Sequence, residues 1–264
     1  WVGGKQEGGK LGDLFAFKQD HIFKDWDDVK ANANNRYDAI GELYGPAAWE
    51  ALKDKAGKQP IEPGDVCWAD LNNDGVINNL DRVKVGNLFP TVTGGFSTTL
   101  GYKDFSLYAR FDYALGHTLY NDLAARSLGQ YQGSFNIIDM VKDSWSETNQ
   151  NTDIPKFYYA DQLSKKNITR SNNGLTAVDN NSSRFYEKGD YLALREITLT
   201  WNLPKKWINK ALMSNASVYV TGQNLFYITG YTGVSPEPAV DTTYGQGLDN
   251  GRYPTPKTVL LGLS

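Results

Sequence analysis

The residues with the clearest capacity for chemistry lie in a short acidic loop between positions 70 and 81. Oxygen-bearing residues stand at its first, third, fifth and twelfth positions, and Gly75 stands at the sixth. An EF-hand loop presents its ligands in this order, with a backbone carbonyl at position seven and a glycine that permits the sharp turn. The spacing therefore predicts a metal site formed by Asp70, Asn72, Asp74, Val76 and Asp81, with Asn78 acting through a water molecule.

The expected ligand of this loop is Ca²⁺, with Mg²⁺ as the alternative that would demand tighter geometry. Asp81 is shorter than the glutamate that usually closes such a loop, and the flanking helices of an EF-hand are missing from the pattern. A second interpretation stays open, namely an Asx-rich turn whose side chains cap its own backbone. A bound cation would stiffen the loop beside the strand predicted over residues 93–100, and it would not catalyse a reaction.

Other reactive side chains give no indication of an enzyme. His21 and His117 have no cysteine or carboxylate at a recognised ligand spacing, and we predict that both are surface histidines in loops. Cys67 is the single cysteine, so an intramolecular disulfide is impossible and a small packed hydrophobe is expected. The sequence has no nucleophile elbow, phosphate-binding loop or zinc-protease motif. We therefore predict a protein that is not an enzyme.

The composition excludes some partners and limits the fold class. The 264 residues carry a net charge of -3 and no long basic run, whereas nucleic-acid binding needs a concentrated basic patch. The 16 Tyr, 7 Trp and 26 Gly suit aromatic-rich strands joined by polar turns. No apolar run approaches the roughly 20 residues of a membrane helix. A soluble β-protein and a β-barrel both remain, because barrel strands carry only a weak alternating signal.

The elements that would position the acidic loop are mostly strands. Over residues 105–113 apolar and polar side chains alternate, so the two sets must lie on opposite faces of a sheet. Short helical segments are expected after Asp25, around 138–145 and within 46–53 and 204–213. About six strands are predicted in total, over residues 11–17, 93–100, 105–113, 184–201, 216–229 and 257–264.

The connections between these strands indicate the architecture. Short turns near 101–104 and 204–213 alternate with long loops over about 20–90, 116–184 and 230–255. Outer-membrane barrels have this asymmetry, with short connections on one side and long ones on the other. We therefore predict an all-β fold, with about six strands of an antiparallel transmembrane β-barrel and long loops containing short helices. The alternative is a soluble, secreted, calcium-stabilised β-sandwich that binds glycan.

Several stretches, in order along the chain, resemble one known family. They are residues 61–87 (IEPGDVCWADLNNDGVINNLDRVKVGN), 90–102 (PTVTGGFSTTLGY), 190–204 (DYLALREITLTWNLP), 218–231 (VYVTGQNLFYITGY) and 250–262 (NGRYPTPKTVLLG). These stretches are similar to those of SusC/RagA-type TonB-dependent transporters of the outer membrane. Residues 25–60 and 116–184 match weakly, as variable loops would.

The resemblance implies a function and a set of partners. Residues 1–264 would form the C-terminal part of a TonB-dependent receptor barrel, without the plug domain and the TonB box. The location would be the Gram-negative outer membrane, in contact with lipid and with the remainder of the same barrel. The implied activity is TonB-dependent uptake of oligosaccharides or peptides together with a SusD-like surface lipoprotein. TonB itself would bind the missing N-terminal part.

The resemblance also implies an orientation for the strands. Counting back from a final strand that ends in the periplasm makes the short turns periplasmic and the long loops extracellular. Phe105, Leu107, Phe111 and Tyr113 would then face lipid, whereas Ser106, Arg110 and Asp112 would face the lumen. Aromatic side chains near strand ends are expected to anchor the barrel at the membrane interfaces. These are Tyr102, Tyr191, Trp201, Trp207 and Tyr227.

Overall fold

The computed structural model describes most of the strands that the sequence predicts. It describes residues 7–32, 36–37, 62–73, 76–77, 79–125, 139–157, 182–211, 213–237, 247–249, 251 and 253–264. The chain forms two compact units, one built from residues 1–88, 119–187 and 239–251 and the other from residues 89–118, 188–238 and 252–264. The helix expected over 46–53 lies outside the described residues.

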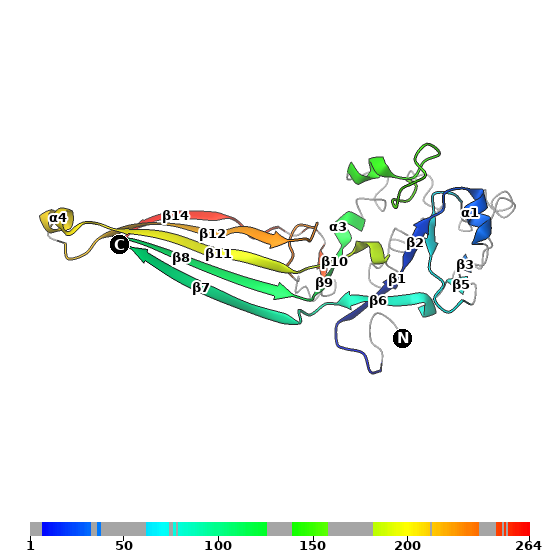
Figure 1. The fold of residues 1–264 in the computed structure, drawn as a ribbon, viewed down its shortest axis with the longest axis horizontal. Coiled ribbons are helices and arrows are strands. Elements are labelled where there is room, and N and C mark those ends of the chain that lie inside the picture. The colour runs from blue at the N-terminus through cyan, green and yellow to red at the C-terminus, as the bar shows by residue number, and fades with distance from the viewer. Residues whose placement is uncertain are drawn as a thin grey trace. The chain divides into compact units, whose positions relative to one another are not determined.

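The second unit is a single five-stranded antiparallel sheet (Figure 1). The strand order is β14-β12-β11-β8-β7. The strands are β7 (Val92–Tyr102), β8 (Phe105–Leu115), β11 (Tyr191–Asn202), β12 (Ser217–Thr229) and β14 (Thr258–Leu263). Four of the five are longer than ten residues, which is the length that a tilted strand needs to cross the apolar part of a bilayer.

One face of this sheet is apolar along its length. The register places a continuous row of aliphatic side chains across all five strands, formed by Leu261, Val220, Leu199, Leu107 and Leu100. Neighbouring rows on the same face are mostly apolar and include the stacked rings of Phe96 and Phe111, whose centroids lie 4.9 Å apart. Many of these side chains are exposed, among them Leu100 at 60% and Leu261 at 79%. The predicted alternation over 105–113 is therefore confirmed.

The opposite face of the sheet is polar. Ser106, Tyr108, Arg110 and Asp112 of β8 lie on it, opposite polar or small residues of β7 and β11. Thr198 of β11 and Thr221 of β12 share a hydrogen bond of 2.8 Å between their hydroxyl groups. A sheet with one apolar, exposed face and one polar face matches the wall of a barrel with lipid outside and a wet interior.

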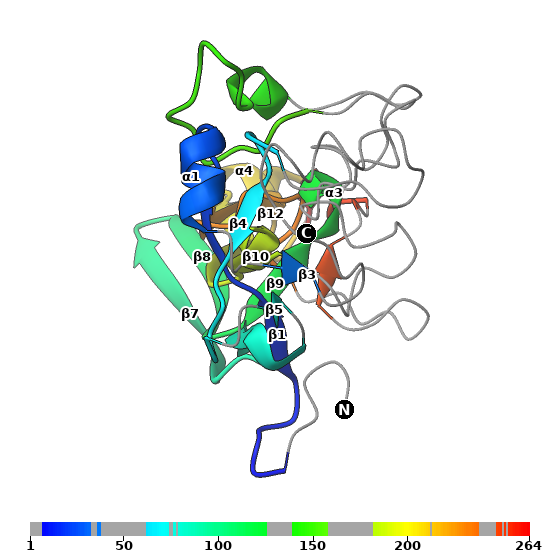
Figure 2. The ribbon, with the colours of Figure 1, turned by 90° about the vertical axis from the view of Figure 1, so that its right-hand side faces the viewer.

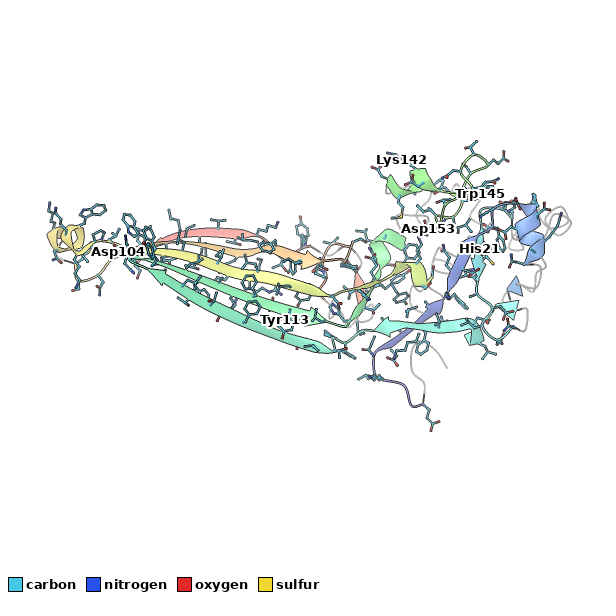
Figure 3. The ribbon with its side chains drawn as sticks, viewed as in Figure 1. His21, Asp104, Tyr113, Lys142, Trp145 and Asp153 are labelled. Carbon is cyan, nitrogen blue, oxygen red and sulfur yellow. The ribbon has the colours of Figure 1, made fainter. Side chains whose placement is uncertain are left out.

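The connections alternate in length as predicted. Lys103 and Asp104 alone join β7 to β8, in the turn that carries Asp104 (Figure 3). The backbone φ of Lys103 is 53°. Residues 203–216 join β11 to β12 and contain α4 (Lys205–Ile208) and the 3-10 turn η7 (Asn209–Ala211), so the expected helical turn is present. The other two connections, 116–190 and 230–257, are long. No helix among the described residues is long and apolar enough to cross a membrane.

Aromatic side chains gather where β11 ends at the short connection. Phe105 stacks on Trp201 with ring centroids 5.9 Å apart, and Trp207 meets Trp201 edge to face at 5.9 Å. Trp207 and Tyr102 are exposed, as side chains of an interfacial girdle would be. The same expectation is wrong for Tyr191 and Tyr227. Their register places them on the polar face, where their rings meet at 5.7 Å.

The first unit is built from small sheets. The strand expected over 11–17 is present as β1 (Asp13–Phe17), but it pairs with β6 (Arg82–Asn87) and not with the five-stranded sheet. β2 (Gln19–Ile22) pairs with β4 (Val66–Trp68), and β3 (Arg36–Tyr37) pairs in parallel with β5 (Val76–Ile77). A three-stranded sheet joins β10 (Tyr186–Lys188), β9 (Thr118–Asn121) and β13 (Leu248–Asp249). The strand predicted over 184–201 is thus interrupted at Gly189 and Asp190.

The first unit also contains short helices. They are α1 (Trp26–Ala31), α3 (Asp122–Ala125) and the 3-10 turns η1 (Asn79–Asp81), η3 (Asp139–Asp143) and η6 (Ser183–Phe185). Asp25 caps α1 as expected, because its carboxylate accepts a hydrogen bond of 2.9 Å from the Asp28 backbone N–H. Val29 of α1 packs with Phe23 and Cys67, which places α1 beside β4 (Figure 2). Cys67 is therefore packed among hydrophobic side chains, as predicted.

An ion pair fixes the start of β1 and predicts an acid-sensitive contact. The Lys84 ammonium lies 2.7 Å from the Asp13 carboxylate, and the Asn87 amide donates to it at 2.8 Å. These hydrogen bonds lower the pKa of Asp13 from 3.8 to about 2. The ionised carboxylate is favoured in the folded state, so its contribution is complete above pH 3.8 and is lost as the pH falls through about 2.

We expect the β1–β6 pairing of the wild-type protein to open more readily as the pH falls from about 4 to about 2. Hydrogen exchange of the β1 amides, corrected for intrinsic exchange rates, measures this opening. In the Asp13→Asn variant, opening of the β1–β6 pairing at neutral pH should be greater than in the wild type. It should not change between about pH 4 and about pH 2. Equal acid sensitivity in both proteins would contradict the assignment to Asp13.

Candidate functional site

The acidic loop begins directly after β4 and ends in the 3-10 turn η1. Asn72 is exposed, whereas Asp81 is completely buried. The Asp81 carboxylate accepts a hydrogen bond of 2.9 Å from the backbone N–H of Leu71, so the last position of the loop lies against its beginning. Asn73 adopts a φ of 59°, a left-handed conformation that suits a sharp turn.

Part of the predicted metal site lies outside the described residues, namely Asp74, Gly75 and Asn78. Val76 lies in β5, where it pairs with Arg36 of β3. The bond from Leu71 to Asp81 suits both interpretations of the loop. A side-chain cap on the loop's own backbone is what an Asx-rich turn requires, yet an ionised carboxylate also has enough lone pairs to bind a cation at the same time. The described residues are thus compatible with a calcium loop and with an Asx-rich turn, and they do not distinguish the two.

A second group of functional side chains lies on the polar face of the five-stranded sheet and centres on Arg195. Its guanidinium donates from Nε to Asp112 Oδ1 at 2.7 Å and from Nη1 to the Tyr227 hydroxyl at 3.0 Å. Nη2 donates to Glu237, and the Tyr227 hydroxyl donates to the same Glu237 oxygen at 2.8 Å. We call Arg195, Asp112, Tyr227 and Glu237 the Arg195 cluster.

Arg195 lies at a β-bulge in β11. The register of β11 against β8 passes from Leu194 opposite Phe111 to Glu196 opposite Arg110, which leaves Arg195 as the extra residue. Arg195 keeps the polar phase of the residues before it, and the bulge brings Glu196 onto the same face, so that the residues from Ile197 onward return to the alternation of the apolar face. Bulges of this kind are common next to functional sites.

An open hollow of about 570 Å³ adjoins the Arg195 cluster. Its wall is formed by residues of β7, β8 and β11. The lining residues are Gly94, Gly95, Phe96, Ser97, Arg110, Phe111, Asp112 and Arg195. The side chains of Arg110, Asp112 and Arg195 lie on the polar face and can form hydrogen bonds with a polar molecule in this hollow, whereas the rings of Phe96 and Phe111 belong to the apolar face.

The sequence prediction for the two histidines is wrong. His117 is only 1% exposed, and its Nε2 lies 2.9 Å from the backbone carbonyl of Pro236. Its ring occupies space that Gly189 leaves open, since a Cβ at position 189 would lie 2.3 Å from His117 Nε2. His21 lies in β2, where both ring nitrogens contact carboxylates. Neither histidine is a solvated loop residue.

The sheet, its apolar exposed face and its alternating connections match the wall of an outer-membrane β-barrel. The chain is 32% identical over 240 residues to TonB-dependent receptor P3 of Formosa agariphila, a match that spans 86% of this chain and 22% of that receptor. It is 31% identical to TonB-dependent receptor P26 of the same organism over 78% of this chain, and 25% identical to TonB-dependent receptor SusC of Bacteroides thetaiotaomicron over 98% of it. The chain thus belongs with the SusC/RagA-type TonB-dependent receptors. No protein-family model matches it.

Solved structures agree on the fold. A structure described as the RagAB peptide importer in the closed-closed state superposes with a TM-score of 0.59 at 20% identity, over 97% of this chain and 23% of that one. The RagAB peptide transporter gives a TM-score of 0.57 at 23% identity, over 76% of this chain and 20% of that one. The chain spans about a fifth of the length of the receptors and transporters that it matches. The soluble sandwich is not favoured, because these similar proteins are receptors and transporters.

Proposed function

We propose that this chain is the C-terminal part of an outer-membrane importer that takes up short polar oligomers, peptides or oligosaccharides, in a TonB-dependent manner. One observation carries the proposal: the five-stranded sheet has an exposed apolar face and a polar face, within a chain 32% identical to a TonB-dependent receptor. An exposed apolar face of this extent is unfavourable in water and favourable against lipid.

The proposed orientation follows from the connections. In outer-membrane barrels the short turns face the periplasm and the long loops face outward. The turn at Lys103 and Asp104 and the connection over 203–216 would then be periplasmic. The long connections, together with the small sheets of the first unit, would be extracellular, where a substrate is first bound.

The proposed partners come from the similar proteins. The matching solved structures are described as RagAB, a peptide transporter and importer, and the resemblance to SusC/RagA implies a SusD-like surface lipoprotein. We propose that such a lipoprotein contacts the extracellular connections and that TonB contacts a part of the receptor outside these 264 residues. The Arg195 cluster and the adjoining hollow would present charged and hydroxyl groups to a polar substrate inside the barrel.

Purification of the intact receptor from outer membranes tests the proposal. We expect it to require detergent, to copurify with a surface lipoprotein, and to support uptake of a labelled peptide or oligosaccharide that stops when TonB is removed. A protein that dissolves without detergent and supports no TonB-dependent uptake would contradict the proposal. A peptide library and an oligosaccharide library, assayed separately, distinguish the two substrate classes.

We also propose that the acidic loop binds Ca²⁺ through Asp70, Asn72, Asp74, the Val76 carbonyl and Asp81. A Kd of about 10⁻⁴–10⁻³ M is expected, as in other extracellular calcium modules. Calorimetry on the intact receptor should give a Ca²⁺ heat that the Asp74→Ala variant loses. The Asp104→Ala variant, which removes an acidic residue from the β7–β8 turn, is the control and should bind as the wild type does. Absence of a Ca²⁺ heat in the wild type would favour the Asx-rich turn.

A further inference from the structure

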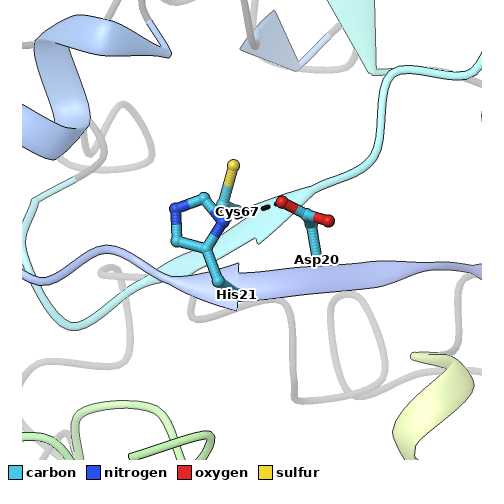
Figure 4. Close-up of side chains that lie close together, drawn as sticks. All are labelled: Asp20, His21 and Cys67. Atoms are coloured by element: carbon cyan, nitrogen blue, oxygen red, sulfur yellow. Dashed lines mark hydrogen bonds and ion pairs between the residues drawn. The ribbon is translucent and has the colours of Figure 1, made fainter. Parts of the chain in front are cut away.

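Three side chains with different metal-binding chemistry meet where β2 pairs with β4 (Figure 4). They are Asp20, His21 and Cys67, and one ligand atom from each lies within 4.8 Å of the others. Cys67 lies directly opposite His21 in the antiparallel pair. Side chains that are directly opposite share a face of the sheet and approach each other closely. The imidazole and the thiol are therefore held together by backbone pairing.

An irregularity in β2 adds the carboxylate to this pair. The register passes from Gln19 opposite Trp68 to His21 opposite Cys67, so that Asp20 is an extra residue in β2. In a regular strand Asp20 and His21 would point to opposite faces. The bulge instead lets Asp20 Oδ2 lie 2.8 Å from His21 Nδ1. Three potential ligands thus converge on one point from two strands.

Asp28 of α1 holds the imidazole from its other side. His21 Nε2 lies 3.2 Å from Asp28 Oδ1, and Asp28 is itself fixed by the backbone N–H of Lys24 at 2.9 Å. A metal-binding histidine commonly donates its second ring N–H to a carboxylate, which sets the tautomer and leaves the first nitrogen for the metal. Asp28 would keep the proton on Nε2 and leave Nδ1 for the cation.

We propose that Asp20, His21 Nδ1 and Cys67 bind a single Zn²⁺ ion, with water as the fourth ligand and Asp28 orienting the imidazole. A thiolate, an imidazole and a carboxylate form a donor set that suits this borderline-soft cation and does not suit Ca²⁺ or Mg²⁺. Ligand atoms around tetrahedral Zn²⁺ lie about 3.5 Å apart, so a small change in side-chain rotamers completes the site.

Access and burial also suit such a site. The side chains of Asp20 and His21 are 58% and 32% exposed, so an ion can enter from solvent. Cys67 is 2% exposed and packs with Phe23 and Val29, which holds its sulfur in place. On binding, the Cys67 thiol would form a bond from sulfur to Zn²⁺ and transfer its proton to the buffer, and the hydrogen bond between His21 Nδ1 and Asp20 would be replaced by a bond from each of these atoms to the ion. The ion would cross-link β2 to β4 and so restrict the motion of β4, the strand that precedes the acidic loop.

Metal titration of the intact receptor in detergent, stripped of metal with a chelator, tests the proposal. We expect one Zn²⁺ to bind per chain with release of a proton, and excess Ca²⁺ not to displace it. Co²⁺, used as a spectroscopic probe, should give the near-ultraviolet absorption band of a cobalt–thiolate bond and the strong visible bands of tetrahedral geometry. Absence of the thiolate band in the wild type would overturn the proposal without recourse to any variant.

Variants assign the ligands. Cys67→Val keeps an apolar side chain of similar size in the core, so the fold should persist while the cobalt–thiolate band disappears and Zn²⁺ affinity falls at least tenfold. His21→Gln should weaken binding similarly, and Asp28→Asn by about 10–100-fold, as other orienting partners do. Asp27→Asn is the matched control, because Asp27 lies beside Asp28 but is 92% exposed and contacts Lys30. Unchanged Zn²⁺ affinity in the folded Cys67→Val variant would overturn the assignment.

Discussion

Replacing Ile197 by arginine is expected to lower the free energy of unfolding of the intact receptor by about 2–4 kcal/mol. Ile197 lies on the apolar face of β11, between Ala109 of β8 and Gly222 of β12. It lies four positions before Trp201, which marks the aromatic end of the sheet. At the usual tilt of barrel strands this distance places Ile197 near the middle of the apolar band, where a cation is most costly. Urea unfolding of the receptor refolded into lipid vesicles measures the loss.

Thr200→Arg provides the matched control for this prediction. Thr200 lies on the polar face of the same strand, opposite Ser106 and Tyr219. An arginine there would remain in a hydrated interior, so little change in unfolding free energy is expected. If both substitutions cost the same, or if Ile197→Arg is tolerated, the apolar face does not contact lipid and the barrel orientation is reversed or absent.

The five-stranded sheet could be predicted because the alternation of apolar and polar residues is contained within a single strand. Apolar and polar residues alternate over 105–113, and a period of two has only one regular structural solution. The lengths of the connections then followed from the positions of the predicted strands along the chain. The partner of β1 could not be predicted, because β6 lies far along the chain and a short strand carries no signal of what it pairs with. The prediction of a strand over 11–17 is therefore confirmed, but its assignment to the barrel wall is wrong.

The Arg195 cluster was missed although the sequence contains a signal for it. Leu192 and Leu194 belong to one phase of alternation, whereas Ile197, Leu199 and Trp201 belong to the other. A change of phase within one strand requires an extra residue, and that residue is Arg195. Glu237, which completes the cluster, lies after the end of β12 and could not be paired with Arg195 by any local pattern.

The proximity of His21 to Cys67 was even harder to predict from a local sequence pattern. Both residues lie in short strands, and nothing in the sequence indicates that β2 pairs with β4 or that a bulge turns Asp20 toward His21. The acidic loop is the opposite case, because an EF-hand pattern places all of its ligands within twelve consecutive residues. A candidate site that is local in sequence can be recognised, and the calcium site of the acidic loop stays a prediction. A cluster assembled by the pairing of distant strands could not be recognised.

Removing the Arg195 side chain should have the second large effect. In the Arg195→Ala variant, Asp112 and Glu237 would face each other without the cation that joins them, and Tyr227 would lose a donor. Breaking a fully buried ion pair costs about 3–5 kcal/mol. Solvent reaches the carboxylates of this cluster, since Asp112 is 38% and Glu237 32% exposed. We therefore expect a loss of about 1–3 kcal/mol in unfolding free energy.

The loss should be localised, because Arg195 joins the segment after β12 to the sheet through Glu237. Hydrogen exchange should increase over residues 231–237 and remain unchanged over β7 and β8. Arg195→Lys should restore the charge but not the contacts, since only a guanidinium can donate to three neighbours in fixed directions. Arg110→Ala, at an exposed arginine on the same face, is the control and should change neither quantity. Equal effects of Arg195→Ala and Arg110→Ala would mean that general charge on the polar face, and not the bulge-directed cluster, holds this segment.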